Sequence, residues 1–170
     1  GESSRKYYSD SMAKNDIEII YQNSDLLLIN KPAGVSVTAD RTGQADILTV
    51  LRKQLPGEGD LRLVHRLDKF TSGVMLIAKR APAQSKFSSF FAKRKISKTY
   101  LAIVNGVAVE REGTIDAAIS RSRRDDRVMQ IDRKRGKEAL SNWELLADFG
   151  MLSLVAVRPI TGRTHQIRVH

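Results

Sequence analysis

Short apolar runs, each closed by a turn signal, recur along the chain. Runs of this length are typical of β-strands rather than of long helices. In chain order they cover residues 17–21, 25–30, 61–67, 74–79, 99–106, 113–120, 142–146 and 151–157. Two other segments, 47–55 and 81–94, carry helical apolar spacing. This mixture predicts an α+β fold with a mixed, largely antiparallel sheet and flanking helices.

The chain shows neither an internal repeat nor a linker-like segment. Its 170 residues are enough for one domain with a hydrophobic core. The first 15 residues are polar, and we expect them to be a flexible arm or a cloning remnant. The sequence therefore predicts a single domain over residues 16–170.

Positive charge is the most unusual property of the composition. The formal net charge is +10 and the pI is about 10.1. Such an excess favours a polyanionic partner, most often RNA or DNA, over an anionic membrane surface. No apolar run is long enough to span a bilayer, and no membrane partner is expected. Cysteine is absent, which excludes disulfides and thiolate metal sites and suits an intracellular protein.

Patterns for metal or nucleotide cofactors are missing as well. The three histidines, His65, His165 and His170, do not have the spacing of a metal site. Neither standard glycine-rich phosphate loop is present. We therefore expect neither a metal nor a cofactor.

Charged residues stand close together in LVHRLDKFTSG, which runs from Leu63 to Gly73. Asp68 lies where a predicted strand gives way to a loop, a common place for catalytic residues. In an extended segment Arg66 and Asp68 would point to the same side. From spacing alone, the commoner interpretation is a structural ion pair or an aspartate that caps a turn.

Two further segments are strongly basic. In TGRTHQIRVH, Arg163 and Arg168 bracket a predicted helix start capped by Thr161, a favourable place for a phosphate. The stretch from Ser120 to Lys137 includes Arg123, Arg124 and Arg127. Each segment could also be a solvated basic surface, but the global charge favours phosphate contacts for the second. Tyr100, in an apolar strand, is by itself more typical of a core aromatic.

Four motifs in order give the chain a family resemblance. HRLDKFTSGVMLIAK (His65–Lys79) resembles the central motif of RluA-type pseudouridine synthases. INKPAGVSV resembles their first motif, KTYLAIVNG the strand with their active-site tyrosine, and RPITGRTHQIRVH their late basic motif. The resemblance extends over residues 16–170. Phe70 departs from the acidic residue often found at its position, and we expect that departure to be harmless.

The resemblance implies a role for several residues. Asp68 would be the catalytic aspartate, Tyr100 the tyrosine stacked near the uracil, and Arg168 the basic partner of the carboxylate. Arg66 would help to fill the space left by a flipped nucleotide. The remaining RNA-binding candidates are His65, Arg163, His165, Arg123, Arg124 and Arg127.

The resemblance also implies an activity, isomerisation of uridine to pseudouridine in ribosomal or transfer RNA by a cytoplasmic monomer. The target uridine would be flipped out of its helix. Two alternatives stay open, a non-catalytic RNA-binding module of the same fold and a nucleoside hydrolase or glycosidase. The second usually needs paired carboxylates or a metal. Because the expected helix shows no end signal before His170, we also expect residues 16–170 to be an incomplete catalytic domain.

Overall fold

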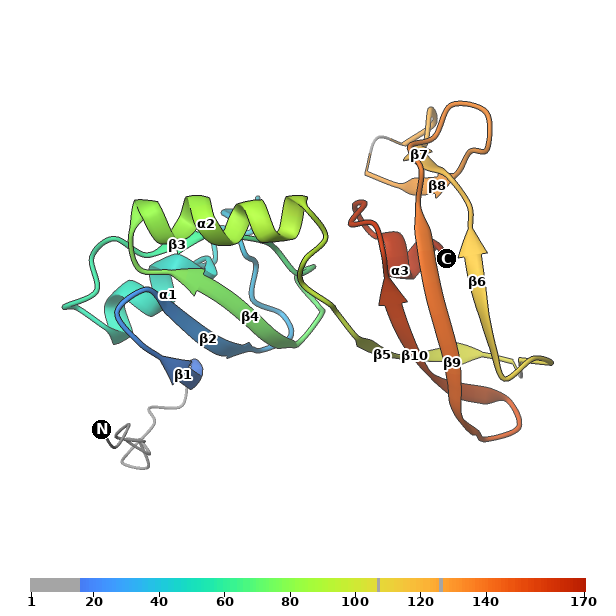
Figure 1. Cartoon of the computed structure of the whole chain (residues 1–170), viewed down its shortest axis with the longest axis horizontal. Coiled ribbons are helices and arrows are strands. Elements are labelled where there is room, and N and C mark those ends of the chain that lie inside the picture. Colours follow the sequence, from blue (N-terminus) through green and yellow to red (C-terminus); the bar gives the residue numbers. More distant parts are fainter. Residues whose placement is uncertain (1–15, 107, 126) are drawn as a thin grey trace. The chain divides into compact units, whose positions relative to one another are not determined.

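The computed structural model describes residues 16–106, 108–125 and 127–170. The predicted arm at residues 1–15 lies outside these ranges. The chain forms two compact units, which meet in sequence between Phe91 and Ala92. Each unit contains a four-stranded antiparallel sheet (Figure 1), which confirms the predicted α+β fold with largely antiparallel pairing. The prediction of one catalytic domain over residues 16–170 stays a prediction.

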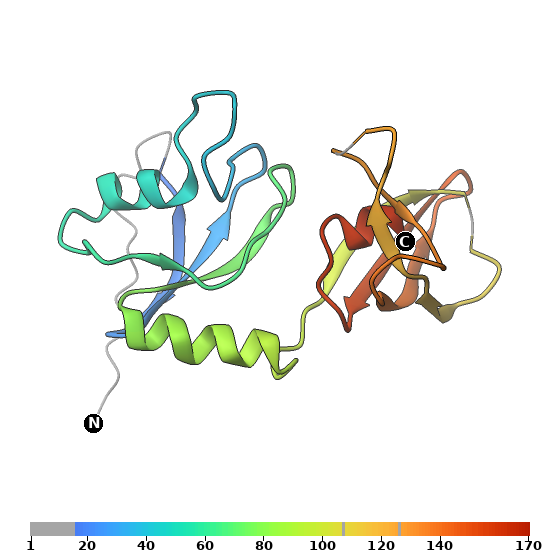
Figure 2. The ribbon, with the colours of Figure 1, turned by 90° about the horizontal axis from the view of Figure 1, so that it is seen from above.

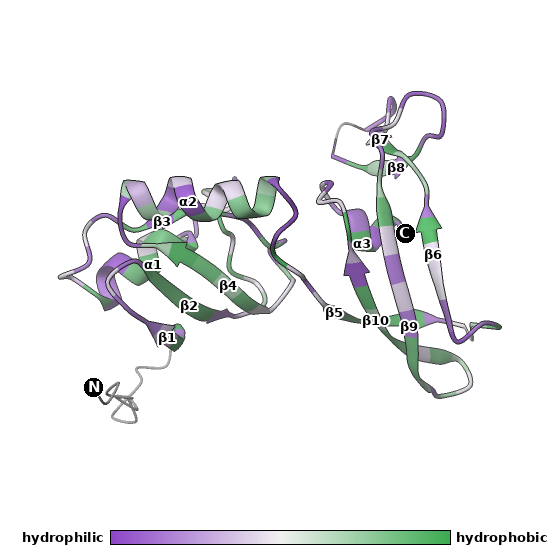
Figure 3. Cartoon of the chain, viewed as in Figure 1, coloured by the Kyte–Doolittle hydropathy of each residue, from purple (hydrophilic) through white to green (hydrophobic). Residues whose placement is uncertain are grey.

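The first unit is built on a sheet with the order β1-β2-β4-β3. Its elements are β1 (Glu18–Gln22), β2 (Leu26–Lys31), α1 (Ile47–Gln54), β3 (Arg62–Leu63), β4 (Gly73–Ala78) and α2 (Ala81–Ala92). In Figure 2 the strands of this sheet run between the two helices. The central strands carry the core, with Leu27, Ile29, Met75 and Ile77 fully buried. Figure 3 shows β4 as hydrophobic along its length.

The helix α1 begins where the sequence predicts. The Asp46 side chain accepts a hydrogen bond from the Thr49 N–H at 2.9 Å, which caps the first turn. Ile47 and Leu51 are buried at a spacing of four residues, so one face of the helix packs into the core.

The strand predicted at residues 61–67 is much shorter in the structure. Only Arg62 and Leu63 pair with β4, and the chain then bends away. The next ladder position is taken by a side chain, because His65 Nε2 accepts the Leu76 N–H at 3.0 Å. Arg66 and Asp68 lie beyond β3, so the predicted strand on which they would point to the same side does not extend to them.

The second unit is built on a sheet with the order β5-β10-β9-β6. Its elements are β5 (Tyr100–Asn105), β6 (Glu112–Asp116), β7 (Ile119–Arg121), β8 (Met129–Ile131), β9 (Leu140–Asp148), β10 (Leu152–Pro159) and α3 (Gln166–Val169). The run predicted as one strand over 113–120 divides into β6 and the start of β7. The basic stretch is not only loop, because β7 and β8 form a two-stranded ribbon within it.

The predicted cap at Thr161 is also wrong. The helix α3 begins only at Gln166, after His165 in a left-handed conformation with φ of 55°. Thr161 is buried instead, and its hydroxyl accepts the Leu140 N–H at 2.9 Å and donates to Gln166 Oε1 at 2.7 Å. The hydroxyl is thus used to join the loop before α3 to the start of β9.

Candidate active site

A buried lysine holds the turn that carries Asp68 by hydrogen bonds to its backbone. Lys31, the last residue of β2, is fully buried, and its ammonium donates hydrogen bonds to three backbone carbonyls. The acceptors are the oxygens of Pro32 at 2.9 Å, Lys69 at 3.0 Å and Thr71 at 2.8 Å. The turn closes on itself through the Thr71 N–H, which donates to the Asp68 carbonyl at 3.1 Å. The residues that follow Asp68 are therefore fixed to the end of β2.

The same lysine places a positive charge near Asp68. Burial lowers the pKa of the Lys31 ammonium below its ordinary value, and the negative charge of Asp68 acts in the opposite direction. Asp68 itself is half-buried. The carboxylate and the ammonium thus interact electrostatically within the first unit. Sequence reasoning missed this role of Lys31, although the motif INKPAGVSV contains it.

A second set of contacts ties the turn to the loop before α1. Lys69 Nζ lies 2.8 Å from Asp40 Oδ2. Asp40 also accepts hydrogen bonds from the Ser36 hydroxyl at 2.6 Å and the Thr42 N–H at 2.9 Å. The Lys69 ammonium, with Ser36 and Thr42, holds the pKa of the Asp40 carboxyl far below its usual range. The Gly34 N–H donates to the Lys69 carbonyl at 2.8 Å, so this loop is also hydrogen-bonded to the backbone of the turn.

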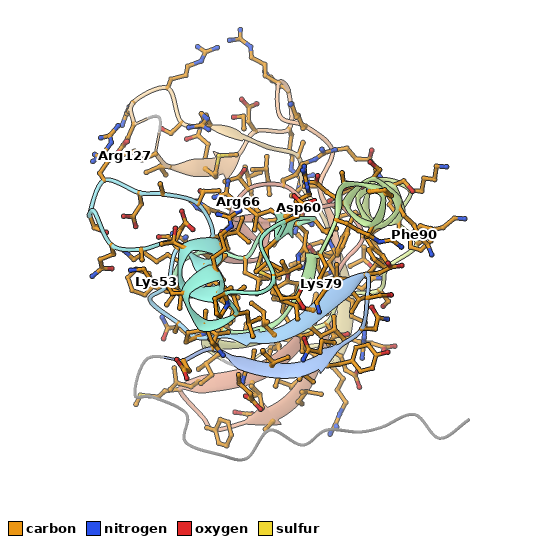
Figure 4. The ribbon with its side chains drawn as sticks, turned by 90° about the vertical axis from the view of Figure 1, so that its left-hand side faces the viewer. Lys53, Asp60, Arg66, Lys79, Phe90 and Arg127 are labelled. Carbon is orange, nitrogen blue, oxygen red and sulfur yellow. The ribbon has the colours of Figure 1, made fainter. Side chains whose placement is uncertain are left out.

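His65 and Arg66, the other two candidates in this motif, differ in their surroundings. The His65 ring stacks on Phe91 with centroids 4.4 Å apart, and its Nε2 accepts the Leu76 N–H. That hydrogen bond requires the neutral ring's proton on Nδ1. Arg66 is exposed (Figure 4). The RNA-binding role of His65 stays a prediction, and the structure adds a packing role beside it.

In the second unit, Tyr100 and the late basic motif lie at the same end of the sheet. Tyr100 is half-buried at the start of β5 and pairs with Val157 near the end of β10. The chain then passes through residues 160–165 into α3, where Arg168 is exposed. The antiparallel register therefore brings the tyrosine and the segment that carries Arg168 to one edge of the unit.

A buried glutamine, Gln166, organises this edge. Its Oε1 accepts from the Thr161 hydroxyl at 2.7 Å and the Arg163 N–H at 3.0 Å. Its Nε2 donates to the Leu140 carbonyl at 3.0 Å and the Ser141 hydroxyl at 2.9 Å. Both the oxygen and the nitrogen of this side-chain amide thus hold the loop before α3 against β9. The sequence motif contains Gln166, but nothing in a single sequence separates its role from that of a surface residue.

The two remaining candidates in this loop have defined backbone surroundings. Arg163 Nε donates to the Glu138 carbonyl at 2.7 Å, which attaches the guanidinium to the backbone just before β9. His165 adopts a left-handed conformation immediately before α3.

The loop between β7 and β8 presents the three arginines predicted to bind phosphates. Arg123, Arg124 and Arg127 are all exposed, and Figure 4 marks Arg127 in this loop. Arg127 forms a bidentate ion pair with Asp125, with Nε–Oδ1 at 2.9 Å and Nη2–Oδ2 at 3.0 Å. This pair lowers the pKa of Asp125 and raises that of Arg127. Part of the charge of Arg127 is therefore already compensated.

The predicted site residues fall into two sets, one in each unit. His65, Arg66 and Asp68 belong to the first unit. Tyr100, Arg123, Arg124, Arg127, Arg163, His165 and Arg168 belong to the second. Over the described ranges no three His, Asp or Glu side chains gather as metal ligands, and no helix is long and apolar enough to cross a bilayer.

Comparison with known proteins identifies the class to which this fold and these motifs belong. The family model for RNA pseudouridylate synthase matches residues 25–170. The chain belongs to this family. Relatives named as ribosomal large subunit pseudouridine synthases C and D confirm the RluA-type resemblance.

Individual relatives and solved structures agree with this assignment. Over 91% of this chain, the large subunit pseudouridine synthase D of Borreliella burgdorferi is 36% identical. An uncharacterised RNA pseudouridine synthase of Zymomonas mobilis is 37% identical over 89% of the chain. The structure of human RNA pseudouridylate synthase domain containing 1 matches with a TM-score of 0.79 and 30% identity, over 95% of this chain and 66% of that one. The chain spans 50% of the length of the first relative and 70% of the second.

Proposed function

We propose that this chain carries the catalytic carboxylate of an RNA pseudouridine synthase, and that Asp68 is that group. The observation that supports the proposal most is the fixed backbone of the turn that Asp68 opens. The carbonyls of this turn are bonded to the buried Lys31 ammonium. A half-buried carboxylate on a backbone held in this way is suited to meet a reacting base, because the turn does not have to be ordered when substrate arrives.

The proposed reaction is an isomerisation and balances without a co-reactant. The bond between uracil N1 and ribose C1′ breaks, and a bond between C5 and C1′ forms. C5 loses a proton, and N1 gains one. A carboxylate can assist either as a nucleophile or as a base. The target uridine must leave the base stack before this chemistry can reach it.

Tyr100, Arg168 and Arg66 are assigned to this reaction by the family resemblance. In the proposal, Tyr100 stacks near the uracil, Arg168 supplies positive charge for the carboxylate, and Arg66 helps to fill the space left by the flipped nucleotide. His65, Arg163, His165 and the arginines of the β7–β8 loop contact the surrounding RNA. The substrate would be ribosomal or transfer RNA, and the protein a cytoplasmic monomer.

The proposal is tested by replacing Asp68 with asparagine. This change is nearly isosteric but removes the charge, so the variant should fold and bind RNA and should form no pseudouridine. Asp60→Asn is the matched control. Asp60, labelled in Figure 4, has an exposed carboxylate that pairs with Arg62, and the control should keep wild-type activity. Both variants are incubated with ribosomal and transfer RNA, and the nucleosides are analysed after digestion.

The same assay separates the rival functions. RNA binding by the wild-type protein without any product would support a non-catalytic module. Release of free uracil would support a hydrolase. Turnover by Asp68→Asn within tenfold of wild type would remove Asp68 from the mechanism.

A further inference from the structure

An aromatic side chain stands exposed beside Asp68. Phe70 is 79% exposed, although a phenylalanine is usually at least partly buried. It follows Asp68 by two residues, which is at most about 7 Å along the chain. The backbone of Phe70 is therefore close to that of Asp68, within reach of a nucleotide next to one bound there.

The backbone on both sides of Phe70 is held rigidly. The carbonyls of Lys69 and Thr71 both accept hydrogen bonds from Lys31 Nζ, at 3.0 and 2.8 Å. The Lys69 carbonyl also accepts the Gly34 N–H at 2.8 Å. The ring thus projects from a turn whose backbone is fixed, so binding a partner costs little additional backbone entropy.

The ring contacts inside the first unit use other aromatic residues. His65 stacks on Phe91, and Phe87 packs edge-to-face on Phe90 with centroids 6.1 Å apart. In the part of the chain that the structure describes, no such ring pair includes Phe70. Aromatic packing within the first unit therefore does not account for the position of Phe70.

We propose that Phe70 is a stacking platform for a nucleobase adjacent to the target uridine. This inference rests on the proposed function, because it requires a uridine to be flipped near Asp68. Flipping leaves the neighbouring bases without one stacking partner, and exposed aromatic side chains are the usual replacement in RNA recognition. Stacking of this kind tolerates every base, so Phe70 strengthens binding without reading sequence. The acidic residue often found at this position could not do so.

The test compares three replacements of Phe70 with an exposed phenylalanine elsewhere. Phe70→Ala removes the ring, Phe70→Leu keeps apolar surface without a ring, and Phe70→Trp keeps an aromatic face. Phe149→Ala is the control, because Phe149 is 68% exposed in the turn between β9 and β10. The substrates are transcribed large-subunit ribosomal RNA and transfer RNA with tritium at uridine C5, which the reaction releases.

Half-saturating RNA concentrations are measured under single-turnover conditions. The Ala and Leu variants should need about 5- to 140-fold more RNA than wild type, which is the range for loss of one base–aromatic stack. The Trp variant and Phe149→Ala should stay within about twofold of wild type. Urea midpoints of all variants should coincide, because the ring is exposed.

The results separate this inference from the function on which it rests. If the wild-type protein releases no tritium from either RNA, the proposed function itself is wrong. If the wild-type protein is active and Phe70→Ala matches it, only the stacking role is wrong. A Leu variant as good as the Trp variant would show apolar contact in place of stacking. A large loss of stability with an unchanged RNA requirement would show that Phe70 packs against protein.

Discussion

Lys31→Met offers the sharpest test of how the candidate site is built. Methionine fills a similar volume and is readily buried, but it cannot donate hydrogen bonds. The substitution leaves the Pro32 and Thr71 carbonyls without the donor that satisfies them now. The Lys69 carbonyl keeps the Gly34 N–H.

The expected loss of stability follows from these two acceptors. An unsatisfied buried acceptor costs about 1–3 kcal/mol, and less where water can reach it. Pro32 is exposed and Thr71 is half-buried, so water can replace part of what the ammonium supplies. The two acceptors together should therefore cost about 2 kcal/mol. With a urea slope of about 2 kcal/mol per M, the unfolding midpoint should fall by about 1 M. The turn at Asp68 loses its attachment in the same variant, so tritium release should fall as well.

Urea unfolding followed by circular dichroism measures this effect. The single tryptophan, Trp143, lies in the second unit, so its fluorescence would not report on the first. Lys53→Met is the control, because Lys53 is exposed on α1 (Figure 4) and its replacement should change stability by less than about 0.5 kcal/mol. A Lys31→Met midpoint equal to that of wild type would refute the idea that the ammonium holds the turn.

The same pair of proteins also has a pH signature. The pKa of Lys31 is lowered in the folded state from an ordinary value of 10.5, so the unfolded chain binds this proton more strongly. Stability therefore rises with pH wherever the two states differ in protonation. Between the lowered pKa and 10.5, wild type should gain stability relative to Lys31→Met. Urea midpoints of both proteins across this range measure the difference, and a constant difference would contradict the cause assigned to the shift.

Two other predictions concern the basic ribbon of the second unit. Replacing Arg123 and Arg124 with glutamine should flatten the slope of log K against log salt by about 1.4 if each contacts one phosphate of single-stranded RNA. Arg127→Gln should flatten it less, because Asp125 already compensates that charge; unchanged slopes would make the loop a solvated surface. Gly136→Ala should cost about 1–3 kcal/mol, because its Cβ would lie 2.5 and 2.7 Å from backbone atoms. Gly59→Ala, with no atom within 4 Å, should leave the urea midpoint unchanged, and equal midpoints for both variants would contradict this reasoning.

The sequence by itself determined the features that depend on local pattern. The alternation and length of apolar runs predict β2, β4, β5, β9 and β10, because a strand must bury one or both faces. The helical apolar spacing of residues 47–55 predicts α1 in the same way. The ordered motifs around Asp68, Tyr100 and Arg168 predict the family, since they preserve residue type and spacing together.

Only the tertiary structure decided what the charged and polar side chains of these motifs do. Lys31 stands in a turn signal and would ordinarily be taken for a solvent-exposed residue. Two of its three acceptors are 38 and 40 residues away in sequence, so its burial depends on the pairing of β2 with β4. The predicted strand through His65 stops early for the same kind of reason, because a side chain takes a ladder hydrogen bond from a strand that follows later in the chain. Local patterns cannot specify these partners, since each exists only after distant segments have come together.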